Sequence, residues 1–505
     1  MHWIGSKIIL ISLLLGMVGI PEAIRADDFR PRQLLVKPRA GLNPALRLRQ
    51  LHAQNQHRVV RQFQRLGGWQ LIELQEGESV AEKIRAYKAS GLVEFAEPNY
   101  RLYAAALPDD PAVLNGSQWA LTNIAAPAGW NLIHDASQVI VAVIDSGLRV
   151  THLDLLTNLW TNPGEIAGDN LDNDGDNYID DIHGFASYYN IAGDRVVGGD
   201  VTDTYGHGTH IAGIIGGVGN NGFGGTGVAW RVKLMALKFL NEVGDGSVED
   251  AIACIDYAIA HGAKIINASW NGASYSRSLE DAFLAARNAG VLVVTAAGNE
   301  NRDNDVIPMY PGQFGFDNIL VVTANARNES IWKSSSTYGA NTGKNSIDLA
   351  APGEDIYSTG IFSDYSFARK NGTSFSTAFV TGAAALLSAR FPHLTAAELR
   401  QRITESVDVL PAFVGKTRTG GRLNLAKALQ TNPAFDLRLA FERSATSSEI
   451  IYQRYPLFSP LILESSTNLT TWSALRTNTI NIPPPWTQPI PTSNHSALFY
   501  RLRSP

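Results

Sequence analysis

Short apolar runs alternate with longer stretches of helical pattern through the middle of the chain. The runs are rich in Val, Ile and Ala and cover residues 139–144, 233–239, 264–268, 291–295 and 319–323. Between them, residues 209–216, 248–261 and 278–290 are long enough for helices. Strands that alternate with helices predict an α/β domain with a mainly parallel sheet covered on both faces. In such sheets ligands bind beyond the carboxyl ends of the strands.

The pattern differs on both sides of this region. Residues 32–103 predict a small α+β unit, with strands at 33–37, 59–63, 69–74 and 93–95 and helices at 44–54 and 80–89. Ser79, followed three residues later by Glu82, is typical of a helix-starting capping box. Residues 104–111 read as an exposed linker, and residues 431–505 alternate like a small β module. We therefore expect boundaries at 27–107, 108–430 and 431–505.

The first 26 residues are typical of a secretory signal. Lys7 precedes the apolar run 8–20, and the small residues Ala23 and Ala26 follow. That run is shorter than the roughly 20 residues that span a membrane, so we expect cleavage and no stable membrane insertion. A retained N-terminal anchor is the alternative. The single cysteine, Cys254, excludes an intramolecular disulfide and lies on an apolar helix face, where we expect a buried thiol.

Composition narrows the class of protein. With 45% hydrophobic and 18% charged residues, the 505-residue chain is globular and not disordered. A net charge of −5 argues against a nucleic-acid binder that depends on electrostatics. The charge is unevenly distributed: residues 27–107 hold 13 basic and 8 acidic residues, whereas residues 108–505 hold 27 and 38. A basic front piece would be attracted to an acidic remainder.

Four polar residues stand at expected strand ends or helix starts. Asp145 ends the run Val-Ile-Asp145-Ser-Gly, and His207 opens the run His207-Gly-Thr-His210. Ser374 opens another helix in Gly372-Thr-Ser374, and Asn299 follows a strand in Ala-Ala-Gly-Asn299. Serine becomes a strong nucleophile when histidine takes its proton, and a carboxylate orients that histidine. A helix N-terminus and the Asn299 amide would supply N–H donors to an oxyanion.

These motifs, in the order Asp, His, Ser, resemble the subtilisin-like serine proteases (subtilases) over residues 110–430. The resemblance implies that Asp145 orients, His207 is the general base, Ser374 is the nucleophile and Asn299 completes the oxyanion hole. It also implies that the front piece is a propeptide that aids folding and inhibits until it is cut near residues 104–108. His210 is expected to be a structural residue of the cleft and not a zinc ligand, because no third ligand is evident.

Three further segments resemble the substrate cleft of that family. Two strand edges would clamp an extended peptide through main-chain hydrogen bonds, and a third segment would wall the specificity pocket. The expected residues are Gly244, Gly246, Ser269, Trp270, Asn271, Gly272, Ala297 and Gly298. Phe375, Ser376 and Thr377 depart from the commonest family pattern and are expected to alter packing only. Asn271 replaces a frequent glycine and is expected to narrow the cleft.

An acidic insert matches the spacing of a calcium-binding loop. Oxygen-bearing side chains fall at loop positions 1, 3 and 5, a glycine (Gly175) at 6, a backbone carbonyl at 7 and a carboxylate at 12. The expected ligands are Asn170, Asp172, Asp174, Asp176 and Asp181. A structural Ca²⁺ there would provide stability that disulfides cannot. The alternative is a solvated acidic turn.

The sequence thus predicts a serine endopeptidase, secreted or held in the cell envelope, of bacterial origin. It would be made as a self-processing zymogen, act as a monomer on peptide or protein substrates and bind its own propeptide. Two alternatives stay open. The chain could be a catalytically inactive subtilase fold that binds peptides or proteins, or a cell-surface protein that depends on the C-terminal module.

Overall fold

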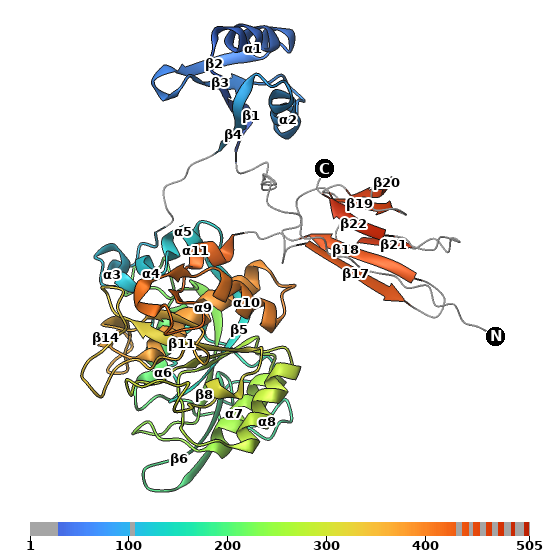
Figure 1. Ribbon diagram of the computed structural model, residues 1–505. Coiled ribbons are helices and arrows are strands. Elements are labelled where there is room, and N and C mark those ends of the chain that lie inside the picture. Colours follow the sequence, from blue (N-terminus) through green and yellow to red (C-terminus); the bar gives the residue numbers. More distant parts are fainter. Residues whose placement is uncertain are drawn as a thin grey trace, which may run out of the picture. The chain divides into compact units, whose positions relative to one another are not determined.

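The computed structural model describes residues 29–100, 107–430 and six strands between residues 437 and 503. The expected signal at 1–26 lies outside the described residues. Residues 29–100 form an antiparallel sheet of order β2-β3-β1-β4 with two helices (Figure 1). Its elements are β1 (Phe29–Pro38), α1 (Leu42–Gln54), β2 (Arg58–Phe63), β3 (Trp69–Glu73), α2 (Val80–Ala89) and β4 (Val93–Tyr100). As expected, the Ser79 side chain caps α2 by accepting the backbone N–H of Glu82.

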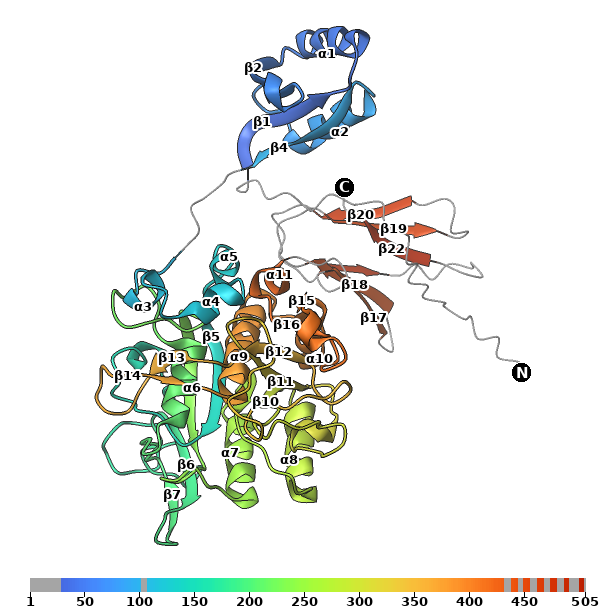
Figure 2. The same ribbon diagram turned by 60° about the vertical axis from the view of Figure 1, so that its left-hand side comes forward.

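The central domain is built on a ten-stranded sheet of order β15-β16-β12-β11-β10-β9-β5-β8-β6-β7 (Figure 2). The five predicted strands correspond to β5 (Asp135–Asp145), β8 (Arg231–Lys238), β9 (Ile265–Ala268), β10 (Leu292–Ala296) and β11 (Ile319–Asn325). These five strands pair in parallel, as the alternation of strands and helices predicted. At one edge β6 (Gly184–Tyr189) and β7 (Arg195–Gly198) pair antiparallel. The other outer strands are β12 (Leu349–Pro352), β15 (Asp408–Val409) and β16 (Gly421–Arg422).

Two hydrophobic cores lie on opposite faces of this sheet. In β5, Val141 and Val143 join one core, whereas Ala142 and Ile144 join the other. The first core includes residues of α6 (His207–Gly216) and α9 (Thr373–Arg390), and the second those of α7 (Val248–Ala260) and α8 (Arg277–Asn288). Strand side chains alternate between faces, so a run apolar at every position needs helices on both. The domain therefore has three layers.

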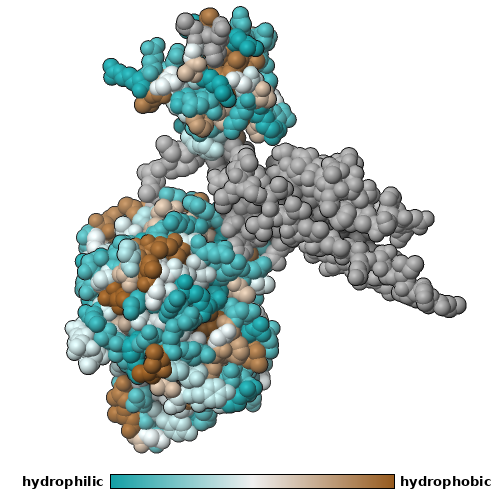
Figure 3. All heavy atoms as spheres, viewed as in Figure 1, coloured by the Kyte–Doolittle hydropathy of each residue, from teal (hydrophilic) through white to brown (hydrophobic). Residues whose placement is uncertain are grey.

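Smaller elements complete the domain. They are the helices α3 (Pro111–Leu114), α4 (Trp119–Asn123), α5 (Ala126–Trp130), α10 (Ala396–Glu405) and α11 (Leu425–Leu429), and the hairpin β13 (Ile356–Thr359) and β14 (Phe367–Lys370). Helix α9 is buried from Thr373 through Leu387, so its first turn, which carries Ser374, is fixed by packing all around. On the face of this domain seen in Figure 3, apolar residues form separate patches among polar ones.

The described part of the C-terminal segment consists of strands, as predicted. They form two three-stranded antiparallel sheets, of order β17-β18-β21 and β20-β19-β22. The strands are β17 (Leu437–Arg443), β18 (Ser448–Arg454), β19 (Leu461–Ser466), β20 (Ser473–Asn478), β21 (Trp486–Pro489) and β22 (Phe499–Arg503). Within the described residues, we find no helix with the length and apolar character needed to cross a membrane.

Candidate active site

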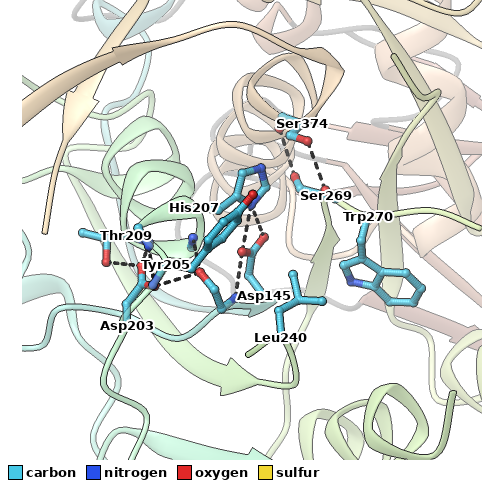
Figure 4. Close-up of polar contacts among 12 residues, drawn as sticks. Asp145, Asp203, Tyr205, His207, Thr209, Leu240, Ser269, Trp270 and Ser374 are labelled. Atoms are coloured by element: carbon cyan, nitrogen blue, oxygen red, sulfur yellow. Dashed lines mark hydrogen bonds and ion pairs between the residues drawn. The ribbon is translucent and has the colours of Figure 1, made fainter. Parts of the chain in front are cut away.

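The imidazole of His207 is hydrogen-bonded to the carboxylate of Asp145. Nδ1 of His207 lies 2.8 Å from Oδ1 and 3.0 Å from Oδ2 of Asp145 (Figure 4). Asp145 is the last residue of β5 and fully buried, and His207 is the first residue of α6. The backbone N–H of Ser146 also donates to Oδ1 of Asp145, at 2.7 Å. A buried carboxylate that accepts from Nδ1–H leaves Nε2 of the imidazole as the basic nitrogen.

Ser374 lies in the first turn of α9. Its Oγ donates to the backbone carbonyl of Ser269 at 3.1 Å, and within the described residues it makes no hydrogen bond to His207. The adjacent Phe375 ring lies 5.5 Å from the His207 ring, so the start of α9 is next to the imidazole. Hydrogen bonds between nucleophile and base often tighten only when substrate binds. Rotation of the Ser374 side chain away from Ser269 would free its Oγ for His207.

Asn299 faces the segment that precedes Ser374. Its Oδ1 accepts the backbone N–H of Thr373 at 2.9 Å and lies 3.1 Å from Oγ1 of Thr373. Gly372 has a φ of 145°, in the range that favours glycine, and a Cβ there would lie 3.5 Å from the Asn299 amide. The Asn299 side chain therefore has a fixed orientation, in which Nδ2 remains available as a donor.

A cavity of about 500 Å³ opens beside His207 and contains most of the predicted cleft residues. It is lined by Gly244, Gly246, Ser269, Trp270, Asn271 and Gly272. The structure also brings in lining residues that the sequence analysis missed: Tyr205, Phe239, Leu240, Asp245, Ser247, Val248, Ala251, Ala273, Ser274, Leu279 and Tyr310. Several of these are ordinary apolar residues of strands and helices, whose position beside the cleft no local motif could indicate.

The remaining two predicted cleft residues, Ala297 and Gly298, do not line this cavity. Ala297 is fully buried. Gly298 has a φ of 107°, and a Cβ there would meet Nδ2 of Asn271 at 3.1 Å. Asn271 therefore reaches over Gly298, in keeping with the expected narrowing.

The acidic insert places carboxylates together, but not in the arrangement of the predicted loop. Oxygens of Glu165, Asp174 and Asp181 lie within 4.8 Å of one another, and the same holds for ligand atoms of Asp174, Asp176 and His261. Asp172 instead accepts the backbone N–H groups of Gly175 and Asn177, and the exposed Asn170 belongs to neither group. Glu165 precedes the predicted loop by five residues, and His261 comes from the end of α7, so the motif indicated neither.

A second pair of buried carboxylates was missed by the sequence analysis. Asp110 is fully buried and its Oδ1 has no hydrogen-bond partner within the described residues, while Oδ2 accepts the N–H of Asn220 at 2.7 Å. Asp154 accepts from Asn221 and from the N–H of Gly225. Burial raises the pKa of Asp154 to about 7, and the nearby charge of Asp110 raises it further. Because an unpartnered buried carboxylate is costly, this pair fits a cation.

Cys254 is fully buried, and burial raises the pKa of its thiol, so the expectation of an inert cysteine is confirmed. His210 is also fully buried. Its Nε2 lies 3.1 Å from the carbonyl of Ile356, and burial lowers its pKa to about 3. It is thus a neutral histidine beneath the cleft.

Comparison with protein families agrees with this geometry. A family described as the subtilase family matches residues 136–432, which is more than half of the chain. A second, described as the fervidolysin N-terminal prodomain, matches residues 19–99. The prodomain match includes the four-stranded sheet of residues 29–100 almost to its end.

Individual relatives point the same way. Thermitase of Thermoactinomyces vulgaris is 32% identical over 64% of this chain and 99% of its own length. A thermophilic serine proteinase of a Bacillus species is 30% identical over 70% of this chain and 76% of its own. Subtilisin-like protease 1 of Plasmodium vivax is 30% identical over 73% of this chain, which spans 61% of that relative. A solved structure of a protease from Pseudoalteromonas arctica superposes with a TM-score of 0.53 and 26% identity, over 64% of this chain and 99% of that one.

Proposed function

Because the chain belongs to the subtilase family of serine endopeptidases, we propose that it hydrolyses peptide bonds through Asp145, His207 and Ser374, and that it is made as a self-processing, secreted zymogen stabilised by calcium. The observation that carries this proposal is the hydrogen bond from His207 Nδ1 to the buried Asp145, beside the helix that begins with Thr373 and Ser374.

In the proposed mechanism the neutral His207 takes the proton of Ser374 Oγ as that oxygen attacks the substrate carbonyl. Asp145 holds the imidazole in the tautomer with Nδ1–H and stabilises the imidazolium that forms. The oxyanion of the tetrahedral intermediate accepts from Asn299 Nδ2 and from a backbone N–H at the start of α9. His207 then protonates the departing amine, and water releases the acyl group from Ser374 by the same steps.

The substrate would bind as an extended strand between two edges of the cavity. Within the described residues, the backbone groups of Gly246 and Asn271 make no hydrogen bond to other backbone groups, whereas Gly272 exchanges two with Tyr310, at 2.9 and 2.8 Å. Gly246 and Asn271 thus present backbone donors and acceptors to a peptide. Recognition through main-chain groups tolerates many sequences, so side-chain preference would come from the cavity walls.

The N-terminal part, which matches a prodomain, would act as folding template and inhibitor of the same chain. Its excess of basic residues complements the acidic remainder. Cleavage within the linker near residues 104–108 would separate it, and the expected domain boundaries at 27–107, 108–430 and 431–505 rest on this interpretation.

Calcium is proposed at two places. The Glu165, Asp174 and Asp181 group and the Asp110–Asp154 pair both offer hard oxygen ligands, and the orphaned Oδ1 of Asp110 fits a cation. The ion would neutralise carboxylates whose mutual repulsion otherwise opposes folding. It takes no part in the catalytic steps.

The decisive experiment follows the N-terminus of the full chain over time in calcium, beside a Ser374→Ala variant. We expect the wild type to trim itself near residue 105 and the variant to stay whole. A fluorophosphonate should label the wild type only. If both proteins stay whole and unlabelled while folded, the enzyme proposal is overturned, and an inactive subtilase fold that binds peptides replaces it.

A further inference from the structure

We propose that Asp203 is a positioning residue of this active site, whose carboxylate holds the backbone around His207 and the residue that follows Asp145 in their reactive arrangement. The inference rests on the proposed function, because it concerns the same triad. Asp203 touches neither the reacting atoms nor the cavity and would act through other residues.

One buried carboxylate collects five hydrogen bonds here. Oδ1 of Asp203 accepts the backbone N–H groups of Tyr205 at 3.0 Å and Gly206 at 2.7 Å, and the Ser146 hydroxyl at 2.9 Å. Oδ2 accepts the N–H of Thr209 at 2.9 Å and its hydroxyl at 2.6 Å (Figure 4). Hydrogen bonds to an ionised acceptor are about twice as strong as neutral ones.

These donors flank His207 on both sides. Helix α6 begins at His207, and its N-cap position is Gly206, which has a φ of 82° and no side chain to cap the helix. The Asp203 carboxylate performs that role from outside the helix, where negative charge is also favourable. Since the N–H groups before and after His207 are bonded to one side chain, the direction of the His207 side chain is set by Asp203.

The same carboxylate is linked to the other triad segment. Ser146 donates its hydroxyl to Asp203, accepts the N–H of Gly208 at 2.9 Å and donates its own N–H to Asp145. Asp145 ends a strand and His207 begins a helix, so nothing local in the chain keeps them in register. Asp203 and Ser146 together join these two elements on the side away from the substrate.

A buried cation completes the network. Nζ of Lys238 donates to the carbonyls of Ser146 at 2.7 Å and Leu240 at 3.0 Å. Burial lowers the pKa of Lys238, and the charges of Asp203 and Asp145 act against that shift. Replacing Asp203 with asparagine would therefore remove a charge as well as acceptors. Ser146→Ala and Thr209→Val each remove one hydroxyl donor to Asp203 and keep its charge.

The test uses the full chain with calcium. Asp203→Asn should slow self-processing and, after processing by wild-type enzyme in trans, lower kcat per titrated active site by roughly 10- to 100-fold, the effect of a small displacement of a reacting group. KM should stay within about 2-fold, since the cavity is untouched. The low-field proton NMR signal of His207 Nδ1–H should move. Ser146→Ala and Thr209→Val should give smaller losses of kcat in the same direction.

Asp348→Asn is the matched control. Asp348 is a buried carboxylate that accepts the N–H of Val321 at 2.9 Å and pairs with Arg400, but it precedes β12, at the opposite edge of the sheet from Asp145. This variant should lower the melting temperature and leave kcat per titrated site unchanged. The proposal is overturned if Asp203→Asn keeps the wild-type kcat and NMR signal, or if the control loses kcat equally.

Two further outcomes are separable. If Asp203→Asn does not fold, the two hydroxyl variants carry the test, and wild-type kcat in both of them would overturn the proposal. Failure of the proposed function would appear instead in the wild type, as a folded chain that neither trims itself nor reacts with a fluorophosphonate.

Discussion

Asn299 is held through its carbonyl oxygen by Thr373, the residue before the nucleophile: Oδ1 of Asn299 accepts the Thr373 N–H at 2.9 Å. A side-chain amide whose oxygen is engaged has its two N–H groups directed elsewhere. This single contact orients the amide nitrogen of Asn299 relative to the start of α9. The proposed oxyanion hole is therefore organised before any substrate arrives.

Asn299→Ala should lower kcat and leave KM nearly unchanged, because the amide donates only to charge that develops in the transition state. We expect a loss of about 10²- to 10³-fold, the range known for removal of one oxyanion-hole donor. Steady-state hydrolysis of a peptide ester or anilide would measure it, with the exposed turn residue Asn328→Ala as control. An equal loss in kcat for both variants, or a change confined to KM, would contradict the assignment.

Asn271→Gly should open the pocket beside Gly298. The Asn271 amide reaches to within 3.1 Å of where a Gly298 Cβ would lie. Removing it should raise kcat/KM for substrates with a bulky side chain in this pocket by about 10-fold, the value of one or two methylene groups. Small side chains should be affected little. Profiling with a library of peptide substrates would show a uniform change, and not a size-dependent one, if Asn271 plays no part in selection.

Removal of calcium should destabilise the folded enzyme. At a free concentration of about 100 times Kd, one bound ion contributes about 2.7 kcal/mol. A chelator should therefore lower the melting temperature of the inactive Ser374→Ala chain, and Asp154→Asn or Asp181→Asn should each weaken that calcium dependence. Differential scanning calorimetry with and without calcium measures both effects. Magnesium at the same concentration is the control, and a melting temperature insensitive to chelation would refute the proposed sites.

Acid should destabilise the fold through His210. Its folded pKa is lowered by burial to about 3, so an unfolded chain takes up this proton at a higher pH than the folded one. The contribution of His210 to stability is complete above about pH 6.5, and it is lost as pH falls from there towards 3. Denaturant midpoints of the Ser374→Ala chain between pH 7 and pH 4, with and without His210→Gln, would test this. Identical pH dependence in both would exclude the effect.

Much of the fold was predictable because its signals are local. The five apolar runs became adjacent parallel strands, and the Ser79 cap was legible from two residues. Boundaries were less accurate where a strand leaves the core. Strand β5 begins at Asp135 and not at residue 139, since its first residues are largely exposed and lack the apolar pattern.

The calcium interpretation shows why spacing alone is insufficient. A loop motif assigns ligands by position along the chain, but Asp172 is used by the backbone of its own turn. Glu165 and His261 approach Asp174 and its neighbours from outside the motif. Likewise Asp110 and Asp154 lie 44 positions apart, and only folding brings their carboxylates to the loop around Asn220 and Gly225.

The sequence by itself determined the family, the α/β class and the residue types that chemistry needs, because each is encoded in short motifs and in the period of apolar residues. Only the tertiary structure decided which donors face which acceptors: that His207 meets Asp145, that Ser374 rests on Ser269, and that Asp203 holds both triad segments. The physical reason is that hydrogen bonding depends on distances of about 3 Å between atoms. Residues 62 or more positions apart reach such distances only when the sheet and its helices are packed.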